Sequence, residues 1–176
     1  KKSVRDQNLS DSSYIRKNPD SIFVESDMAG TNAPYISPKM FRETVFPYMK
    51  ERITRLKKYM DKVILHNCGM NIPLMDMFIE MGIDCYQSLQ TTAGMEIGKL
   101  KSMFGKKMSF WGGISTETLI AGSADDVRKN IRTALERGAP GGGFILGPSH
   151  SIAYGTKYDN FMAMLDEFEK YRDKYY

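Results

Sequence analysis

The sequence has no long apolar run and contains little cysteine, histidine or tryptophan. Among 176 residues there are two cysteines, two histidines and one tryptophan. No run approaches the ~18 apolar residues of a membrane-spanning helix, and the polar start predicts no secretory signal. So few cysteines exclude a disulfide scaffold. We therefore expect a cytoplasmic protein that has no membrane partner.

The charge pattern does not point to a polyanionic partner. The formal net charge is +4, with 26% charged and 41% hydrophobic residues, which is ordinary for a globular domain. The basic residues Arg52 and Arg55 alternate with apolar Ile53 and Leu56, as on a solvated helix face. No aromatic–basic recognition motif accompanies them. We expect no nucleic-acid partner.

Strand and helix patterns alternate along most of the chain. Residues 1–20 are polar and predict a lead-in segment that is irregular or weakly helical. Five apolar segments are typical of strands, at 21–27, 62–66, 83–89, 107–111 and 143–147. Helical periodicity follows each of them, at 37–60, 72–81, 95–104, 123–138 and around Phe161 to Phe168.

This order predicts an α/β fold with a parallel sheet and right-handed crossovers. No strand pattern alternates with period two, so the strands should be buried on both faces. Pro47 predicts a break in the helix at 37–60. A doubly wound sheet and a piece of a (β/α)₈ barrel both fit. No Gly-x-Gly-x-x-Gly follows the first strand, which disfavours the dinucleotide-binding form of the open sheet.

The candidate functional residues stand where strands end. In parallel α/β folds, function gathers at the carboxyl ends of the strands. His66 and Cys68 end the second strand, and His150 follows the fifth. An imidazole and a thiol are typical zinc ligands, and a zinc site used in catalysis keeps one position open. His66, Cys68 and His150 are therefore candidate metal ligands at one rim of the predicted sheet.

Other strand ends supply acidic, amide and glycine residues. Asp27, with Glu25 nearby, follows the first strand and is expected to bind the ion or to orient a histidine. We expect the substrate to be bound by the residues at the remaining rim positions, Gln87, Gln90, Gly112, Gly113 and Tyr154.

Several motifs resemble the uroporphyrinogen decarboxylase superfamily. They are Ser-Pro-Lys-Met-Phe at 37–41 with Pro-Tyr at 47–48, His-Asn-Cys-Gly at 66–69, Phe-Trp-Gly-Gly-Ile at 110–114 and Gly-Gly-Gly-Phe-Ile-Leu-Gly-Pro-Ser-His at 141–150. The resemblance runs from about residue 21 to the C-terminus. It implies that residues 21–176 form the last five βα units of a (β/α)₈ TIM barrel.

The His-x-Cys pair is similar to the zinc-dependent, corrinoid-linked methyltransferase branch of this superfamily. That branch implies zinc as cofactor, a corrinoid protein as partner and a methylated small molecule or a thiol as substrate. Asp27, His66 and His150 would be the catalytic residues. In the coenzyme M enzymes of the branch the third ligand is a Cys, whereas the matching position here is His150. This favours a methylated oxygen or nitrogen substrate over a thiol.

Two alternatives remain open. One is a metal-independent decarboxylase, since the decarboxylases also have a His near position 150. The other is a barrel fragment without activity of its own, because five strands cannot close an eight-stranded barrel and leave open edges. Such a fragment should pair with itself as a homodimer or with a missing N-terminal barrel half. We expect the isolated chain to run larger than its 20.0 kDa mass on a sizing column.

Overall fold

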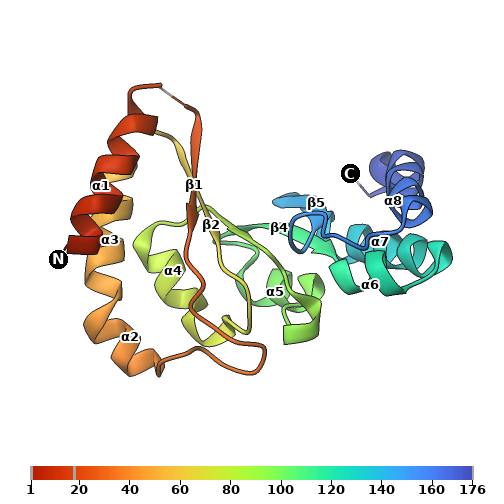
Figure 1. Ribbon diagram of the computed structural model, residues 1–176, viewed down its shortest axis with the longest axis horizontal. Coiled ribbons are helices and arrows are strands. Elements are labelled where there is room, and N and C mark those ends of the chain that lie inside the picture. The colour runs from red at the N-terminus through yellow and green to blue at the C-terminus, as the bar shows by residue number, and fades with distance from the viewer. Residues whose placement is uncertain (1, 18, 176) are drawn as a thin grey trace. The chain divides into compact units, whose positions relative to one another are not determined.

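The structure is a computed structural model that describes residues 2–17 and 19–175. Five strands alternate with helices, and their order in the sheet, β1-β2-β3-β4-β5, is that of the chain (Figure 1). The chain divides into two compact units between Tyr86 and Gln87. None of the described helices is both long and apolar enough to cross a membrane.

The first unit contains a parallel strand pair and its helices. β1 and β2 pair in parallel, with Ser21 opposite Lys62 and Glu25 opposite His66. Figure 1 shows α1 running alongside α3. The elements in chain order are α1 (Lys2–Ile15), β1 (Ser21–Glu25), α2 (Pro38–Thr44), α3 (Phe46–Leu56), β2 (Lys62–His66), the 3₁₀ turn η1 (Ile72–Leu74), α4 (Met75–Met81) and the start of β3 (Cys85–Gln87).

The helix signals of the first unit act as the sequence indicates. Ser37 caps α2, because its hydroxyl accepts the Met40 N–H at 3.2 Å. The break predicted from Pro47 is confirmed: α2 ends at Thr44, and α3 begins with Pro47 in its first turn, where a missing N–H costs nothing. Gly82 ends α4 in the left-handed conformation.

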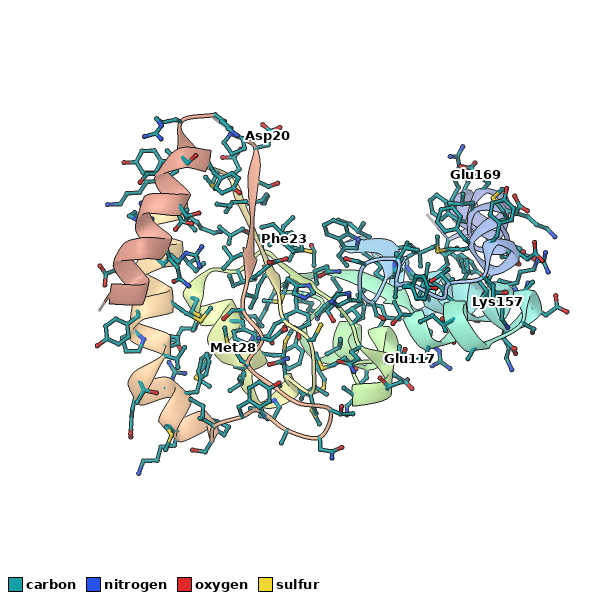
Figure 2. The ribbon with its side chains drawn as sticks, viewed as in Figure 1. Asp20, Phe23, Met28, Glu117, Lys157 and Glu169 are labelled. Atoms are coloured by element: carbon teal, nitrogen blue, oxygen red, sulfur yellow. The ribbon has the colours of Figure 1, made fainter. Side chains whose placement is uncertain are left out.

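Two features of the first unit differ from expectation. The lead-in forms a continuous helix, α1, rather than an irregular segment. Asp11 of α1 explains its docking, because this buried carboxylate binds Arg52 and Arg55 of α3 at 2.8 and 2.9 Å. In addition, β1 is not buried on both faces: Ile22 and Val24 are buried, whereas Phe23 is 41% exposed (Figure 2).

The second unit packs around its last two long helices. Its core contains Ile114 of β4, Leu119 of α6, Ile131 of α7 and Met164 of α8. β4 and β5 pair in parallel, with Phe110 opposite Phe144. The elements are the 3₁₀ turn η2 (Thr91–Ala93), α5 (Ile97–Phe104), β4 (Ser109–Ile114), α6 (Thr116–Ala121), α7 (Ala124–Gly138), β5 (Phe144–Pro148), α8 (Tyr158–Tyr171) and the 3₁₀ turn η3 (Arg172–Lys174).

The strand ends of the second unit deviate from the predicted ranges. β3 ends at Gln87 because Ser88 and Leu89 turn to positive φ values of 150° and 48°. Leu89 is fully buried in a conformation that a branched side chain rarely adopts. β4 extends through both glycines to Ile114, and the helix α6 that follows it is not among the predicted elements. The backbone is therefore strained where β3 ends.

Candidate metal centre

His66 and Cys68 form a donor pair at the end of β2. Cys68 Sγ lies 3.5 Å from His66 Nε2. A tetrahedral zinc ion bound to both atoms at usual bond lengths would hold them about 3.5 Å apart. The His66 side chain is 14% exposed, so it is largely fixed but still accessible. The geometry of this pair therefore fits a zinc ion.

Asp27 lies beside the pair and orders its backbone. The carboxylate oxygen Oδ1 accepts the Cys68 N–H at 3.0 Å and lies 3.9 Å from His66 Nε2. The Asp27 side chain is 58% exposed, so a ligand can approach it from solvent. The parallel pairing of β1 and β2 explains the position, because it sets Glu25 opposite His66 and brings the two strand ends together. Asp27 thus lies near His66, and its expected role of binding the ion or orienting the histidine stays a prediction.

A buried polar network lies under the Cys68 loop. Asn67, Asn71 and Tyr86 are each fully buried. The Asn67 side-chain oxygen accepts the Met28 N–H at 3.0 Å and an N–H of Asn71 at 3.1 Å. The Tyr86 hydroxyl donates to the Asn67 carbonyl oxygen at 2.5 Å. The sequence analysis did not identify these three residues. The only signal in the sequence was the Asn-x-x-x-Asn spacing of Asn67 and Asn71, which does not include Tyr86.

Gly69 completes this loop because no side chain fits at its position. Its φ is +86°, and an added Cβ would lie 2.7 Å from the Gly30 carbonyl oxygen and would also clash with Ala29. Met70 N–H donates to the same Gly30 oxygen at 2.9 Å. The loop after β2 and the loop after β1, where Figure 2 labels Met28, are thus in direct contact.

Cys85 contributes no thiolate to this region. It is the first residue of β3 and is 6% exposed. Burial raises the pKa of its thiol to about 12, with the neighbouring Asp84 carboxylate adding to the effect. The thiol therefore stays protonated at neutral pH, and Cys68 is the thiol available for metal binding.

His150 belongs to the second unit and follows β5 by two residues. It is exposed. The preceding residue, Ser149, is buried, and its N–H donates to the Ile114 carbonyl oxygen at 2.7 Å. This bond continues the β4–β5 pairing beyond the end of β5. His150 is thus held at a strand end, as predicted, and its role as a ligand stays a prediction.

The predicted substrate residues have different surroundings. Gln87 is buried at the end of β3, and Gln90 donates to the Thr92 hydroxyl at 3.2 Å. At Gly112 (φ +143°) an added Cβ would lie 2.7 Å from the Ser88 carbonyl oxygen, so internal packing already requires this glycine. The neighbouring Gly113 has φ +96°, and Tyr154 is fully exposed. Contact of any of them with substrate stays a prediction.

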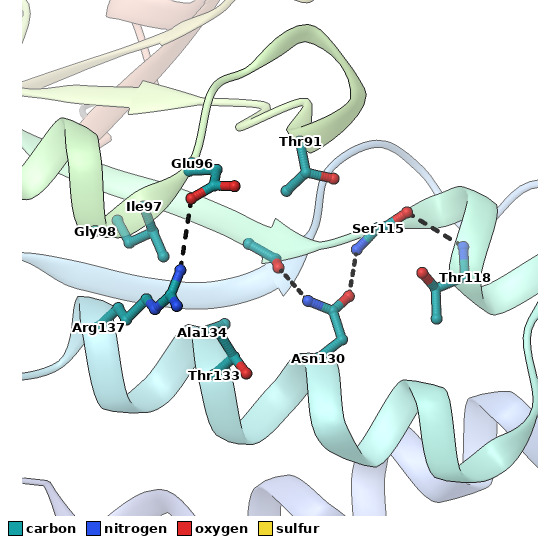
Figure 3. A pocket seen from close by; sticks show the side chains of 11 residues that line it. Thr91, Glu96, Ile97, Gly98, Ser115, Thr118, Asn130, Thr133, Ala134 and Arg137 are labelled. Atoms are coloured by element: carbon teal, nitrogen blue, oxygen red, sulfur yellow. Dashed lines mark hydrogen bonds and ion pairs between the residues drawn. The ribbon is translucent and has the colours of Figure 1, made fainter.

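A separate polar cavity of about 270 Å³ lies between α5, α7 and the end of β4 (Figure 3). Arg137 and Glu96 form an ion pair at 3.5 Å on its wall. Asn130 accepts the Ser115 N–H at 2.9 Å and donates to the Gly113 carbonyl oxygen at 3.1 Å. Gly113 alone among the predicted site residues lines this cavity. The Arg137–Glu96 pair and the Asn130 bonds connect the wall of this cavity internally, which indicates a structural role for these residues.

Comparison with known proteins identifies the family. The family model described as Uroporphyrinogen decarboxylase (URO-D) matches residues 15–171. The chain belongs to the uroporphyrinogen decarboxylase family. The resemblance inferred from the four motifs is therefore confirmed, and the match covers both units. A search of curated proteins finds no match.

A solved structure shows the fold of this family member. The chain is similar to a methyltransferase from Methanosarcina mazei, with a TM-score of 0.73 and 20% sequence identity. The match covers 93% of this chain but 46% of that one. The expected partial (β/α)₈ barrel is therefore confirmed, and the chain spans about half the length of the matched methyltransferase.

Proposed function

We propose that this member of the uroporphyrinogen decarboxylase family acts in a zinc-dependent methyltransferase that exchanges a methyl group with a corrinoid protein. The observation that carries the proposal is the 3.5 Å separation between Cys68 Sγ and His66 Nε2 at a strand end. A soft donor pair of this geometry suits zinc. The fold likeness to a methyltransferase supports the same branch of the family.

In this proposal His66, Cys68 and His150 bind the ion. Two imidazoles and one thiolate leave the fourth zinc position for substrate. Bound zinc would supply Lewis acidity, which polarises the bond between the substrate's oxygen or nitrogen and its methyl group. The methyl group would pass to the reduced cobalt(I) of the corrinoid partner, which supplies the electron pair of the new bond, while the bond from the methyl carbon to oxygen or nitrogen breaks and the demethylated substrate leaves with that bond's electron pair.

The chain's own residues have defined tasks in this scheme. Asp27 accepts the Cys68 N–H and so holds the backbone of that candidate ligand, and its carboxylate lies 3.9 Å from His66 Nε2, beside the proposed position of the ion. Gln87 and Gln90 are proposed to bind polar groups of the methylated substrate, and Gly112 and Gly113 to allow it close approach. Tyr154, which is fully exposed, is proposed to cover the open side of the site.

The complete activity is proposed to need more of the barrel than this chain provides. β1 and β5 are the outer strands of the described sheet. Each exposes a large apolar side chain, with Phe23 41% and Ile145 48% exposed. We propose that a second copy or an additional barrel half covers these edges. The isolated chain should then elute above its 20.0 kDa mass on a sizing column; a stable monomer would contradict this part of the proposal.

Zinc content tests the proposal most directly. Purified protein should bind about one zinc per chain, and His66→Ala and Cys68→Ser should each abolish binding. Cys85→Ser is the matched control, because Cys85 is a buried thiol with a raised pKa, and it should keep full zinc content. Zinc retained by His66→Ala would refute the assignment. A wild-type protein that binds no zinc would instead favour the metal-independent decarboxylase.

Transfer itself is measured with free corrinoid. Reduced cobalamin should gain a methyl group from a methylated oxygen or nitrogen compound, which is visible as the change from its reduced to its methylated absorption spectrum. Asp27→Ala should slow this reaction while leaving zinc content closer to wild type. No spectral change with the zinc-loaded, barrel-complete protein over a panel of such donors would reject the methyltransferase function.

A further inference from the structure

Three fully buried polar residues lie beneath the candidate ligand pair and make an unusual set. Asn67, Asn71 and Tyr86 all have no exposed surface. Asn67 separates His66 from Cys68, and Tyr86 belongs to the next strand. Buried polar groups are normally paired, and those that are not need an explanation. These three residues have no part in the zinc chemistry proposed above.

The Asn71 amide holds the loop backbone from inside. Its nitrogen lies 2.7 Å from the Cys68 carbonyl oxygen, 3.2 Å from that of Gly69 and 3.1 Å from the Asn67 side-chain oxygen. Three oxygens around one nitrogen fix the orientation of the amide, because a reversed Asn71 would face oxygen with oxygen. The carbonyl of Cys68 is thus fixed by Asn71, and its N–H is fixed by Asp27 at 3.0 Å.

The Tyr86 hydroxyl holds the residue between the two candidate ligands. It donates to the Asn67 carbonyl oxygen at 2.5 Å. Burial raises the pKa of Tyr86, so the hydroxyl stays protonated and continues to donate. The ring itself is fixed by Phe78, whose ring is stacked with it at 6.1 Å between centroids, and Phe41 packs edge-on against Phe78. An aromatic cluster therefore positions a single hydrogen-bond donor.

Two polar atoms of the network have no partner among the described protein atoms, so the network buries more polar surface than the loop backbone alone requires. The Asn67 side-chain nitrogen and the Asn71 side-chain oxygen are buried without a hydrogen-bond partner in the described part of the chain. A buried unpaired polar atom destabilises a fold, and apolar residues of similar shape avoid this cost. Retaining two such atoms is understandable if the amides are needed to shape the loop.

We propose that Asn67, Asn71 and Tyr86 are positioning residues that set the separation of His66 Nε2 and Cys68 Sγ for metal binding. This inference rests on the proposed zinc function. Residues that orient metal ligands through hydrogen bonds affect metal affinity strongly, and their loss commonly weakens it 10–100-fold. The three residues act on the ligands through the backbone of residues 67–69.

The test removes one hydroxyl and leaves the ring in place. Tyr86→Phe should weaken zinc affinity about 10–100-fold in competition with a chromophoric chelator. It should also shift the absorption bands of the cobalt(II)-substituted protein. In amide hydrogen exchange, the Cys68 and Met28 amides should lose protection. Asn71→Ala should act in the same direction on all three measurements.

Two control variants separate positioning from stability. Tyr59→Phe makes the same chemical change at a tyrosine that is 54% exposed, and it should match wild type throughout. Leu56→Ala empties a fully buried position in α3, and it should lower the unfolding midpoint without changing zinc affinity. Equal weakening of zinc binding by Leu56→Ala and Tyr86→Phe would overturn the proposal, and so would wild-type affinity with unchanged Cys68 amide protection in Tyr86→Phe.

The exchange measurement keeps this inference distinct from the proposed function. If the wild-type protein binds no zinc, the zinc function fails. The Cys68 amide could still be protected in the wild type and lose that protection in Tyr86→Phe but not in Tyr59→Phe. That result would still show that Tyr86 positions the loop. Unchanged protection would reject the positioning role whatever the metal content.

Discussion

The two units stabilise their helices by different means. In the second unit, Ser115 and Ser123 cap α6 and α7 by accepting N–H groups three residues ahead. In the first unit, α3 and α4 begin without a side-chain cap. There, Asp11 reaches 41 residues along the chain to bind Arg52. The contrast holds for particular helices: α6 and α7 have local caps and α3 is bound by a distant carboxylate, whereas α2 of the first unit is capped by Ser37 and α8 of the second is held by the long-range bond from Asn160 to the Leu119 carbonyl oxygen.

This difference bears on where the candidate site is built. The pair of His66 and Cys68, with Asp27 and the buried amides, lies entirely in the first unit. His150, whose role as a ligand is a proposal, belongs to the second unit and is exposed. A site formed from long-range contacts depends on the whole unit being folded, because no single segment holds the donors in place. Mutations that break the polar contacts around the donor pair should therefore affect metal binding and stability together, whereas a cavity in α3, as in Leu56→Ala, should lower stability alone.

The largest expected contrast is between the two thiols. Burial raises the pKa of the Cys85 thiol to about 12, so its thiolate fraction at pH 8 is about a thousandth of an ordinary thiol's. Alkylation followed by mass spectrometry should modify Cys68 and leave Cys85 unmodified until the protein unfolds. Because the pKa is higher in the folded state, Cys85 should also reduce stability as pH rises from 9 toward 12. Rapid Cys85 labelling at pH 8 would show that the first unit is open.

The next contrast compares a buried carboxylate with an exposed one. Asp11→Ala leaves two partly buried arginines without their partner and should cost about 3 kcal/mol in the free energy of unfolding. Asp125→Ala in the second unit removes an exposed pair with Arg128 and should change it by less than about 0.5 kcal/mol. Urea unfolding measures both. Equal effects would contradict the distinction between long-range and local support.

Two left-handed glycines provide a matched comparison. Gly69→Ala would strain the backbone and also bring the new methyl group into a clash with Ala29 and Gly30. It should lower the free energy of unfolding by about 2–3 kcal/mol and weaken zinc binding. Gly94 also has a positive φ, +75°, but no atom lies within 4 Å of an added Cβ. Gly94→Ala should therefore lower the free energy of unfolding by about 1 kcal/mol, from backbone strain alone. Thermal unfolding with zinc titration measures the difference. A Gly69→Ala variant that binds zinc normally would show that the loop contact is dispensable.

The smallest effect is expected at the cap of α7. Ser123→Ala removes the capping hydroxyl and should cost about 1 kcal/mol. The hydrogen bonds from the Ser123 side chain and backbone lower the pKa of Asp126. Stability from this carboxylate is therefore present above its unfolded pKa and lost as pH falls. Ser123→Ala should flatten the acid side of the stability profile, and an unchanged profile would argue against the cap.

The sequence predicted the elements that have local signals. Ser37, Pro47, Gly82 and Ser123 each marked a helix boundary that the structure confirms. The donor pair was also visible, because a strand that ends in His-x-Cys needs no distant residue to be recognised. Strand order followed from the alternation of helix and strand patterns.

Long-range contacts explain what the sequence could not show. The docking of α1 depends on Asp11 meeting two arginines more than 40 residues away. The role of Tyr86 depends on Asn67, which lies 19 residues earlier in the chain. The early end of β3 results from a buried leucine held at positive φ, where composition alone favours a strand. Each of these is decided by tertiary packing.

The contact between the loops after β1 and β2 also has a consequence for protein engineering. Only glycine fits at position 69, because any larger residue would clash with Ala29 and Gly30. The Met28 N–H also donates to the side-chain oxygen of Asn67. We expect neither loop to tolerate an insertion, because lengthening one would displace the other. Anyone transplanting this centre into a new scaffold would have to move residues 27–30 and 66–71 as one cassette, with both backbones copied together.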